Sequence, residues 1–268
     1  MFKAAFFDID GTLVSFKTHT VPDSTRRAIG ELRSRGVKCF ISSGRHMVNI
    51  DNLGDLVFDG YVTVNGGMTY MDGKLIDSNP IAKSDVMSAL GMVYPAPGRP
   101  MVSGVKPFAV CFVLKDRLVM NHEDDKTEQV FKQLNFTNRP QVADLREFEG
   151  ADVFQMISFF GVADEQVVMA ALPRCQSARW SPLFTDIVPL GQSKVRGMRR
   201  VCEVIGAEPS EVMAFGDGGN DVEMLRFAGV GVAMGNAADS VKEQADMVCP
   251  SVDDDGILWA VNKLLASR

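Results

Sequence analysis

The stretch Phe6-Phe7-Asp8-Ile9-Asp10-Gly11-Thr12, close to the start of the chain, decides the expected fold. Residues 4–7 form an apolar run bounded by a turn signal, which is typical of a buried strand. Two carboxylates one residue apart would repel each other at the end of such a strand and resist desolvation, unless a cation lay between them. Hard oxygen ligands of this kind suit Mg²⁺. A strand that ends in a solvated acidic turn is the alternative, because short motifs have many false matches.

Composition limits the class of protein. The 268 residues are enough for one large domain or two modest ones, and 46% apolar with 23% charged residues is ordinary for a soluble globular protein. The net charge of −6 and the absence of any Lys/Arg block argue against a nucleic-acid-binding face. Charged or polar residues interrupt every apolar run before it reaches the length of a membrane span, so we expect no membrane association.

The cysteines point to a reducing compartment. They are scattered, odd in number and never spaced as metal-binding pairs: Cys39, Cys111, Cys175, Cys202 and Cys249. This pattern favours reduced, mostly buried thiols over a disulfide framework. The chain also enters its first strand without a basic leader and cleavage site, so we expect no signal peptide and a cytoplasmic location.

Strand and helix signals alternate on both sides of a long insert. Strands are expected at residues 37–42, 60–64, 212–215, 230–234 and 247–249, and helices at 24–35, 195–205, 222–228 and from 239. Short connections between such elements are typical of βαβ units and a parallel sheet. The pattern therefore predicts an α/β, Rossmann-like core formed by residues 1–82 and 190–268.

The insert, residues 83–189, differs from the core in its sequence pattern. Helices are expected at 84–93, 125–134 and 164–172, strands at 108–114, 153–160 and within 178–188, and a Pro- and Gly-rich loop at 94–107. It lacks the acidic or Gly-rich strand ends of the core. We therefore expect an inserted α+β cap domain.

Polar groups distant in the sequence follow three expected core strands. Asp8 with Asp10, Ser43, and Asp217 with Asp221 each lie just past the carboxyl end of an apolar strand. If these strands are parallel members of one sheet, the three loops lie at the same edge. Ligands of open α/β sheets bind in the crevice outside that edge.

These groups fit phosphoryl transfer. Asp8 and Asp217 can supply carboxylate oxygens to Mg²⁺, which also binds a substrate phosphate. Ser43 can donate its hydroxyl and its backbone N–H to phosphate oxygens, and Gly44 allows the backbone to approach closely. With the charge on the oxygens met by such donors, a carboxylate can attack phosphorus and form an acyl phosphate.

Three further residues would support this chemistry. Lys194 is a compact charge that can neutralise a phosphate, and Asn220 lies at the start of a helix, where amide groups favour an anion. Asp10 is placed to protonate the leaving oxygen and later to activate water. Two alternatives stay open: Lys194 as a solvated lysine at a helix start, and Asp221 as a residue that only favours a helix N-terminus.

Four ordered motifs resemble those of the haloacid dehalogenase-like (HAD) phosphatase superfamily: Asp8-Ile9-Asp10-Gly11-Thr12, Ser43-Gly44-Arg45, Lys194, and Gly216-Asp217-Gly218-Gly219-Asn220-Asp221. The insert between the second and third motifs resembles the Cof-type branch, as do Asn65-Gly66-Gly67 before it and Met234-Gly235-Asn236 near the end. Members of that branch carry an α+β cap over a Rossmann-like core, and many dephosphorylate sugar phosphates and related metabolites.

The resemblance implies Asp8 as the nucleophile and Asp10 as the general acid and base. It implies Mg²⁺ on Asp8, on Asp10 through its carbonyl, and on Asp217, with Asp221 assisting the metal indirectly. The implied phosphate ligands are Ser43, Gly44, Lys194 and Asn220. For Arg45 we expect a structural ion pair, and for His46, where the branch usually has proline, a surface or loop position.

Three functions are compatible with these residues. The expected one is a Mg²⁺-dependent phosphatase of small phosphorylated metabolites, with an aspartyl-phosphate intermediate and the cap as a moving lid. A phosphotransferase or mutase on the same core is the second. The third, a non-catalytic phosphosugar-binding protein, is disfavoured because binding alone would not require Asp10.

Overall fold

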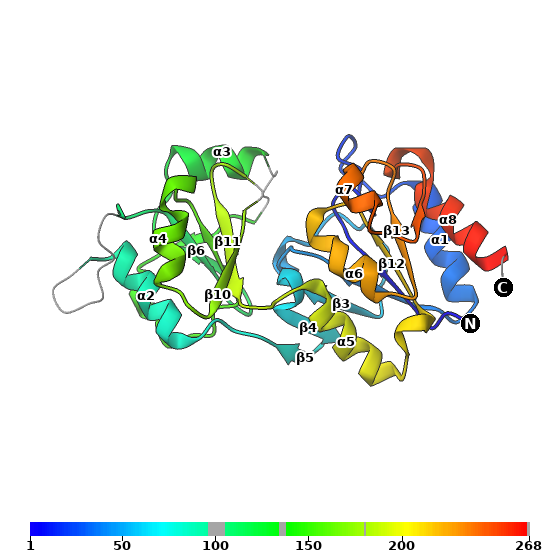
Figure 1. The fold of residues 1–268 in the computed structure, drawn as a ribbon, viewed down its shortest axis with the longest axis horizontal. Coiled ribbons are helices and arrows are strands. Elements are labelled where there is room, and N and C mark those ends of the chain that lie inside the picture. The colour runs from blue at the N-terminus through cyan, green and yellow to red at the C-terminus, as the bar shows by residue number, and fades with distance from the viewer. Residues whose placement is uncertain (96–104, 134–137, 180, 267–268) are drawn as a thin grey trace. The chain divides into compact units, whose positions relative to one another are not determined.

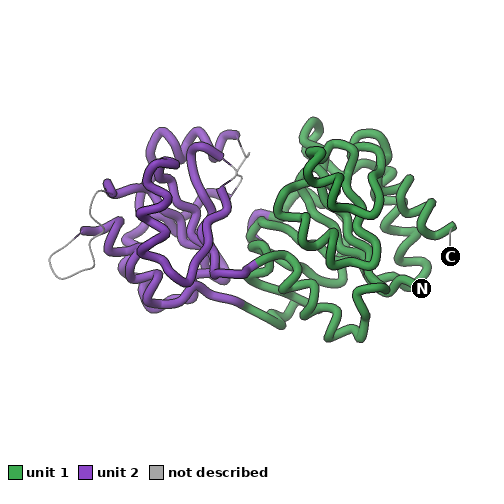
Figure 2. Tube along the Cα trace, in the orientation of Figure 1, with its two compact units in different colours: residues 1–46, 50–78, 193–268 green, residues 47–49, 79–192 purple. Residues whose placement is uncertain are grey.

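The computed structural model of the protein describes residues 1–95, 105–133, 138–179 and 181–266. They form two compact units, traced in Figure 1 and coloured separately in Figure 2. The core unit comprises residues 1–46, 50–78 and 193–268, and the inserted unit comprises residues 47–49 and 79–192. The expected core, residues 1–82 and 190–268, differs from this unit by a few residues at each boundary and by residues 47–49, which belong to the inserted unit.

The core unit is built on an eight-stranded sheet with the order β14-β13-β12-β1-β2-β3-β4-β5. Six strands run parallel: β1 (Ala4–Phe7), β2 (Lys38–Ser42), β3 (Gly60–Thr63), β12 (Val212–Gly216), β13 (Val230–Ala233) and β14 (Met247–Val248). The predicted parallel sheet is thereby confirmed. The strand that carries Asp8 at its end is central, between β2 and β12.

The remaining two strands form an antiparallel hairpin that the sequence pattern did not predict. They are β4 (Met68–Met71) and β5 (Lys74–Ser78), joined by Asp72-Gly73. Both turn residues have positive φ, 48° and 71°. An Asp-Gly pair between two apolar segments is a hairpin signal, because a type I′ turn requires this conformation at both central residues.

Helices cover both faces of the core sheet. On one face are α1 (Asp23–Ser34) and α8 (Gly256–Ala266), and on the other are α5 (Lys194–Ile205), α6 (Val222–Phe227) and α7 (Asp239–Lys242). The helix α8 was not among the predicted elements, although the buried Ile257, Ala260 and Val261 have helical spacing. This helix packs against α1 and completes one layer of the core.

Side chains of β1 alternate between the two apolar cores. Phe7 packs on the α1/α8 side, where its ring stacks on Phe215 of β12 at 4.9 Å. Phe6 packs on the opposite side, where it stacks on Phe40 of β2 at 5.0 Å. Such ring pairs add about 0.5–1.5 kcal/mol each beyond the buried area. They tie β1 to both neighbours, which holds the ends of the three strands in register.

The inserted unit has its own sheet, with the order β10-β11-β9-β6-β7-β8, antiparallel except between β7 and β8. Its strands are β6 (Val110–Val113), β7 (Leu118–Met120), β8 (Gln141–Val142), β9 (Gln155–Ser158), β10 (Cys175–Ala178) and β11 (Thr185–Pro189). Its helices are α2 (Lys83–Val93), α3 (Asp125–Gln133) and α4 (Glu165–Ala170). This is the expected α+β composition. Most of the predicted 94–107 loop, residue 134 of the predicted 125–134 helix, and residue 180 lie outside the described residues.

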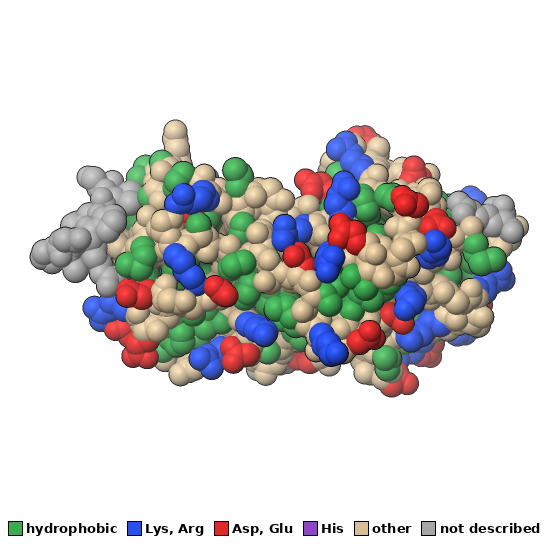
Figure 3. All heavy atoms as spheres, turned by 90° about the horizontal axis from the view of Figure 1, so that it is seen from below, with side chains coloured by type: hydrophobic (Ala, Val, Ile, Leu, Met, Phe, Trp, Pro, Cys, Tyr) green, Lys and Arg blue, Asp and Glu red, His purple; other side chains and the backbone are tan. Residues whose placement is uncertain are grey.

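All five cysteines are buried, as expected. In the described part of the chain, no helix combines the length and apolarity needed to cross a bilayer. Acidic and basic side chains are interspersed on the face drawn in Figure 3.

Candidate active site

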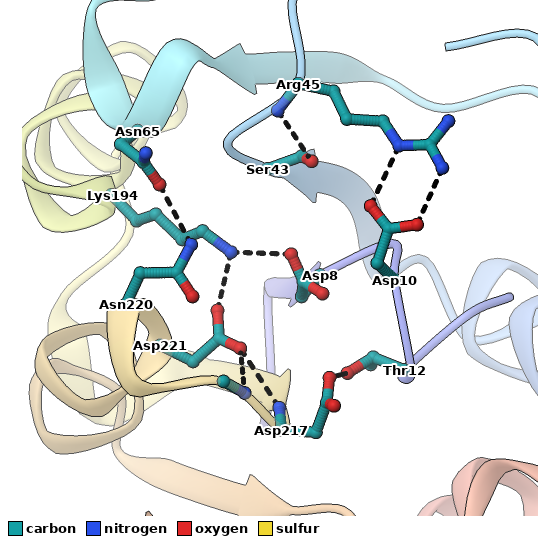
Figure 4. Close-up of polar contacts among 11 residues, drawn as sticks. Asp8, Asp10, Thr12, Ser43, Arg45, Asn65, Lys194, Asp217, Asn220 and Asp221 are labelled. Atoms are coloured by element: carbon teal, nitrogen blue, oxygen red, sulfur yellow. Dashed lines mark hydrogen bonds and ion pairs between the residues drawn. The ribbon is translucent and has the colours of Figure 1, made fainter. Parts of the chain in front are cut away.

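Three neighbouring parallel strands bring the predicted site residues together at one edge of the sheet. Phe7, the last residue of β1, is level with Ile41 in β2 and with Phe215 in β12. Asp8 therefore follows β1 where Ser43 follows β2 and Asp217 follows β12 (Figure 4). The prediction that these loops share one edge is confirmed.

Lys194 lies at the centre of this site. It is the first residue of α5, is fully buried, and its Nζ donates to Asp8 Oδ1 and to Asp221 Oδ1, both at 2.6 Å. Burial by itself would lower the pKa of Lys194, but the two carboxylates outweigh it and raise this pKa. The interpretation of Lys194 as a solvated helix-start lysine is therefore wrong.

Asp8 is buried beside this ammonium group. Burial raises the pKa of Asp8 well above its usual range, Lys194 acts in the opposite direction, and the Asp221 and Asp217 carboxylates raise the pKa further. A cation bound at Asp8 would oppose this rise in the pKa, because it would favour the ionised carboxylate.

Asp221 joins the lysine to the loop after β12. Its Oδ1 accepts from Lys194, while its Oδ2 accepts from the backbone N–H groups of Asp217 at 3.0 Å and Gly218 at 2.8 Å. Asp221 thus stabilises the short 3₁₀ turn Gly219–Asp221 that precedes α6, and also holds the buried ammonium. It does not serve the helix N-terminus alone.

Asp217 is oriented by two side chains. Its Oδ1 accepts from Thr12 Oγ1 at 2.8 Å, and its Oδ2 accepts from Asn236 Nδ2 at 3.3 Å. The same Asn236 amide donates to the carbonyl of Gly11 at 2.8 Å, so it links the loops after β1 and β12. Burial raises the pKa of Asp217 to about 6, partly opposed by the Thr12 hydrogen bond.

Three carboxylates, the buried Asp8 and Asp221 and the partly buried Asp217, form a group that can hold a metal ion. One oxygen from each of Asp8, Asp217 and Asp221 lies within 4.8 Å of the others. In their ionised forms, the single ammonium of Lys194 leaves two negative charges unmatched. A hard divalent cation such as Mg²⁺ fits both the oxygen donors and this charge.

The carboxylate of Asp10 faces a different partner. Arg45 binds it with two hydrogen bonds, from Nε to Oδ2 at 2.8 Å and from Nη2 to Oδ1 at 2.6 Å. Figure 4 shows this pair beside the Asp8 cluster rather than within it. The expected ion pair of Arg45 is confirmed.

The loop after β2 departs from expectation at two residues. The backbone N–H of Ser43 donates to the Val62 carbonyl at 2.8 Å, so the expectation that this amide binds phosphate is wrong: it is part of the β2–β3 ladder. The Ser43 hydroxyl accepts from the Arg45 N–H at 3.1 Å and keeps its own hydrogen for donation. His46 lies in this loop, which was one of its two predicted positions, but it is only 4% exposed, so the alternative of a surface position is wrong.

Asn220 and Asn65 meet beside this loop. Asn220 Nδ2 donates to Asn65 Oδ1 at 3.0 Å, and the Asn65 side chain lies against Gly44. Asn65, Thr12 and Asn236 were not among the predicted site residues, although each lies in one of the motifs quoted above. The missing information was spatial, since each residue acts on a loop distant in the sequence.

Comparison with known proteins covers nearly the whole chain. The model of the haloacid dehalogenase-like hydrolase family matches residues 5–261. The provisionally named phosphatase YkrA of Bacillus subtilis (strain 168) is 34% identical over 265 residues, which are 98% of this chain and 97% of YkrA.

Solved structures show the same architecture. The HAD subclass IIB sugar phosphatase BT4131 is 34% identical with a TM-score of 0.86, and the match covers 98% of each chain. BT1666 from Bacteroides thetaiotaomicron, a protein studied among the HAD phosphatases, is 32% identical with a TM-score of 0.86, covering 98% of this chain and 95% of that one.

Proposed function

Since the chain belongs to the haloacid dehalogenase-like hydrolase family, and is a hydrolase of phosphate monoesters, we propose that it uses Mg²⁺ and an aspartyl-phosphate intermediate to hydrolyse small phosphorylated metabolites, with sugar phosphates as the main class. One observation carries the proposal: the oxygens of Asp8, Asp217 and Asp221 converge within 4.8 Å around the edge that also holds Lys194.

Asp8 and Asp217 would hold the metal through their carboxylates, and Asp10 through its backbone carbonyl. Asp221 is better suited to an indirect role than to direct contact with the metal, because both of its oxygens already accept hydrogen bonds from Lys194 and from backbone amides. When bound, Mg²⁺ would neutralise charge on the oxygens of the transferring phosphoryl group.

Asp8 would be the nucleophile. Its carboxylate oxygen forms a bond to phosphorus as the bond from phosphorus to the leaving oxygen breaks, which gives an aspartyl phosphate and an alcohol. Asp10 would donate the proton to the leaving oxygen, and then accept one from the water that releases inorganic phosphate and regenerates Asp8. For this step the Asp10 carboxylate must leave, or share, the guanidinium of Arg45.

Four groups would bind the phosphoryl oxygens: the Ser43 hydroxyl, the Gly44 backbone N–H, the Lys194 ammonium and the Asn220 amide. Lys194 would also neutralise the carboxylate of Asp8, since its Nζ already donates a hydrogen bond to that group. Together these donors match the negative charge that the phosphoryl oxygens carry throughout the transfer.

Sugar phosphates are the proposed substrate class because BT4131, similar over 98% of both chains, is a sugar phosphatase. The inserted α+β segment, residues 83–189, would act as the lid that selects the leaving group and excludes water. A cytoplasmic location, where reduced thiols and phosphorylated metabolites coexist, is part of the same proposal.

The test is a screen of the purified protein against phosphorylated sugars, nucleotides and cofactors with Mg²⁺, measuring free phosphate. We expect release from sugar phosphates, lost after removal of the metal with a chelator. The Asp8→Asn variant should remain folded and lose at least about a thousandfold in turnover, as expected for a nucleophile.

Three results would contradict the proposal. An isomerised sugar phosphate with no free phosphate would indicate a mutase, in which the acyl phosphate passes to a sugar hydroxyl. Binding of phosphosugars without turnover would indicate a sensor. Undiminished activity of Asp8→Asn would remove the proposed nucleophile.

A further inference from the structure

The turn after β3 has an unusual backbone. Three consecutive residues are left-handed: Val64 with φ 53°, Asn65 with φ 50° and Gly66 with φ 86°. Glycine adopts this conformation freely and asparagine tolerates it, but a β-branched residue such as Val64 is a genuine outlier. Conformations of this kind persist only where the surrounding structure imposes them, and they gather at functional sites.

The surroundings of this turn are the proposed phosphate loops. The Val64 N–H donates to the Arg45 carbonyl at 3.1 Å, and the Asn65 N–H donates to the Ser43 carbonyl at 3.0 Å. These two hydrogen bonds lie on either side of Gly44. On the other side of the turn, a Cβ on Gly66 would lie only 2.2 Å from the carbonyl oxygen of Ser193, next to Lys194.

The Asn65 carboxamide lies among these loops (Figure 4). Its Nδ2 and Oδ1 are 3.2 and 3.3 Å from the position that a Cβ on Gly44 would take, so the side chain covers that glycine. The oxygen accepts from Asn220 Nδ2 at 3.0 Å, which determines which end of the amide faces Asn220. Among the described residues, the hydrogen bonds of this carboxamide use only its oxygen. Its Nδ2 therefore keeps its donors for a ligand.

We propose that Asn65 is a further phosphate-binding residue, whose Nδ2 donates a hydrogen bond to an oxygen of the phosphoryl group. The left-handed turn is the means of presenting it, because it brings the carboxamide over Gly44 and beside Asn220. This inference rests on the proposed function of the site, since both assume that phosphate binds at this edge.

The test uses Asn65→Gly, which separates the side chain from the turn. Glycine adopts a φ of 50° without strain, so if Asn65 served only the turn, its replacement by glycine would leave phosphate affinity unchanged. The probe is inorganic phosphate in the presence of Mg²⁺, with affinity measured by calorimetry and also as product inhibition of hydrolysis. We expect the affinity to fall roughly 10- to 100-fold, as for a lost hydrogen bond to a charged group, while the unfolding temperature stays within a few degrees of the wild type.

Asp72→Gly is the matched control. It also replaces a left-handed residue, with φ 48°, by glycine, but in the exposed β4–β5 turn, and it should leave phosphate affinity unchanged. Asn65→Asp is the second variant. It keeps an oxygen for Asn220 and replaces the donor by a negative charge, so it should bind phosphate no better than Asn65→Gly.

The outcomes separate the two proposals. Equal phosphate affinity in wild type and Asn65→Gly would overturn the role of Asn65 and leave hydrolysis standing. A wild type that binds phosphate but never hydrolyses a phosphomonoester would overturn the proposed function, while the affinity comparison would still decide the role of Asn65. A wild type that binds no phosphate would overturn both.

Discussion

Arg45 donates hydrogen bonds to both carboxylate oxygens of Asp10, the residue proposed as the general acid and base of the reaction. The pair is partly exposed, with 26% of the Arg45 side chain and 38% of the Asp10 side chain accessible. A partly exposed ion pair contributes little to stability, about 0–1 kcal/mol. We expect this ion pair to orient Asp10 instead, since a bidentate contact restricts the rotation of the carboxylate.

We therefore predict that Arg45→Ala lowers kcat by roughly tenfold, because Asp10 loses its fixed orientation, while the free energy of unfolding changes by less than about 1 kcal/mol. Arg45→Lys keeps the charge but not the planar fork, and should fall between wild type and Arg45→Ala. Steady-state kinetics and urea unfolding measure the two effects. A wild-type kcat in Arg45→Ala would contradict this role.

Lys194→Met should destabilise the core unit strongly. It leaves the buried carboxylates of Asp8 and Asp221 without their shared cation, and breaking a buried ion pair costs about 3–5 kcal/mol. Added Mg²⁺ should recover part of this loss by neutralising Asp8. Denaturant unfolding with and without Mg²⁺ measures both effects.

Lys3→Met is the control for this variant. Lys3 also pairs with a carboxylate, Glu211 at 2.8 Å, but 48% of its side chain is exposed. Its loss should cost no more than about 1 kcal/mol. Similar losses in the two variants would argue against an essential charge at the centre of the site.

Gly11→Ala should weaken Mg²⁺ binding. Gly11 has φ 83°, and a Cβ there would lie 2.2 Å from Asp217 Oδ2, so the alanine must displace that carboxylate. Gly36→Ala is the matched control, because Gly36 has a similar φ of 78° with no atom within 4 Å of a Cβ. Backbone strain should cost about 1–2 kcal/mol in both variants, but only Gly11→Ala should lose metal affinity. Calorimetric titration with Mg²⁺ distinguishes them, and equal affinities would contradict the prediction.

Stability should depend on pH through Asp217. Its pKa is raised to about 6 by burial, whereas an unfolded aspartate titrates at about 3.9. Between these values the folded state binds more protons than the unfolded state. The metal-free protein therefore loses stability as the pH rises through this window, by up to about 3 kcal/mol. The raised pKa of Asp8 acts in the same direction.

Mg²⁺ should reverse this trend, because it binds the ionised carboxylates. We expect its stabilising effect to be small near about pH 5 and large near about pH 7, measured as the shift in unfolding temperature. Asp217→Asn should show little shift at either pH. An equal shift of the wild type at both values would contradict the assignment of Asp217 as a ligand.

Much of the core could be predicted from short-range patterns. The apolar runs before Asp8, Ser43 and Asp217 identified three strands that the structure places side by side. Such runs are typical of a parallel sheet, because helices cover both of its faces. The β4–β5 hairpin and α8 were not predicted, although each has a local signal: Asp72-Gly73 for the hairpin, and the helical spacing of Ile257, Ala260 and Val261 for the helix.

By itself, the sequence predicted the residues that are proposed to carry the chemistry, since carboxylates and a hydroxyl at strand ends, with a lysine at a helix start, limit it to a few reaction types. Only the tertiary structure decided how they pair. It assigned Lys194 to Asp8 and Asp221, Arg45 to Asp10, Asn65 to Asn220, and the Ser43 amide to the sheet. The physical reason is that hydrogen bonds and ion pairs depend on distances of about 3 Å, which spacing along the chain does not specify.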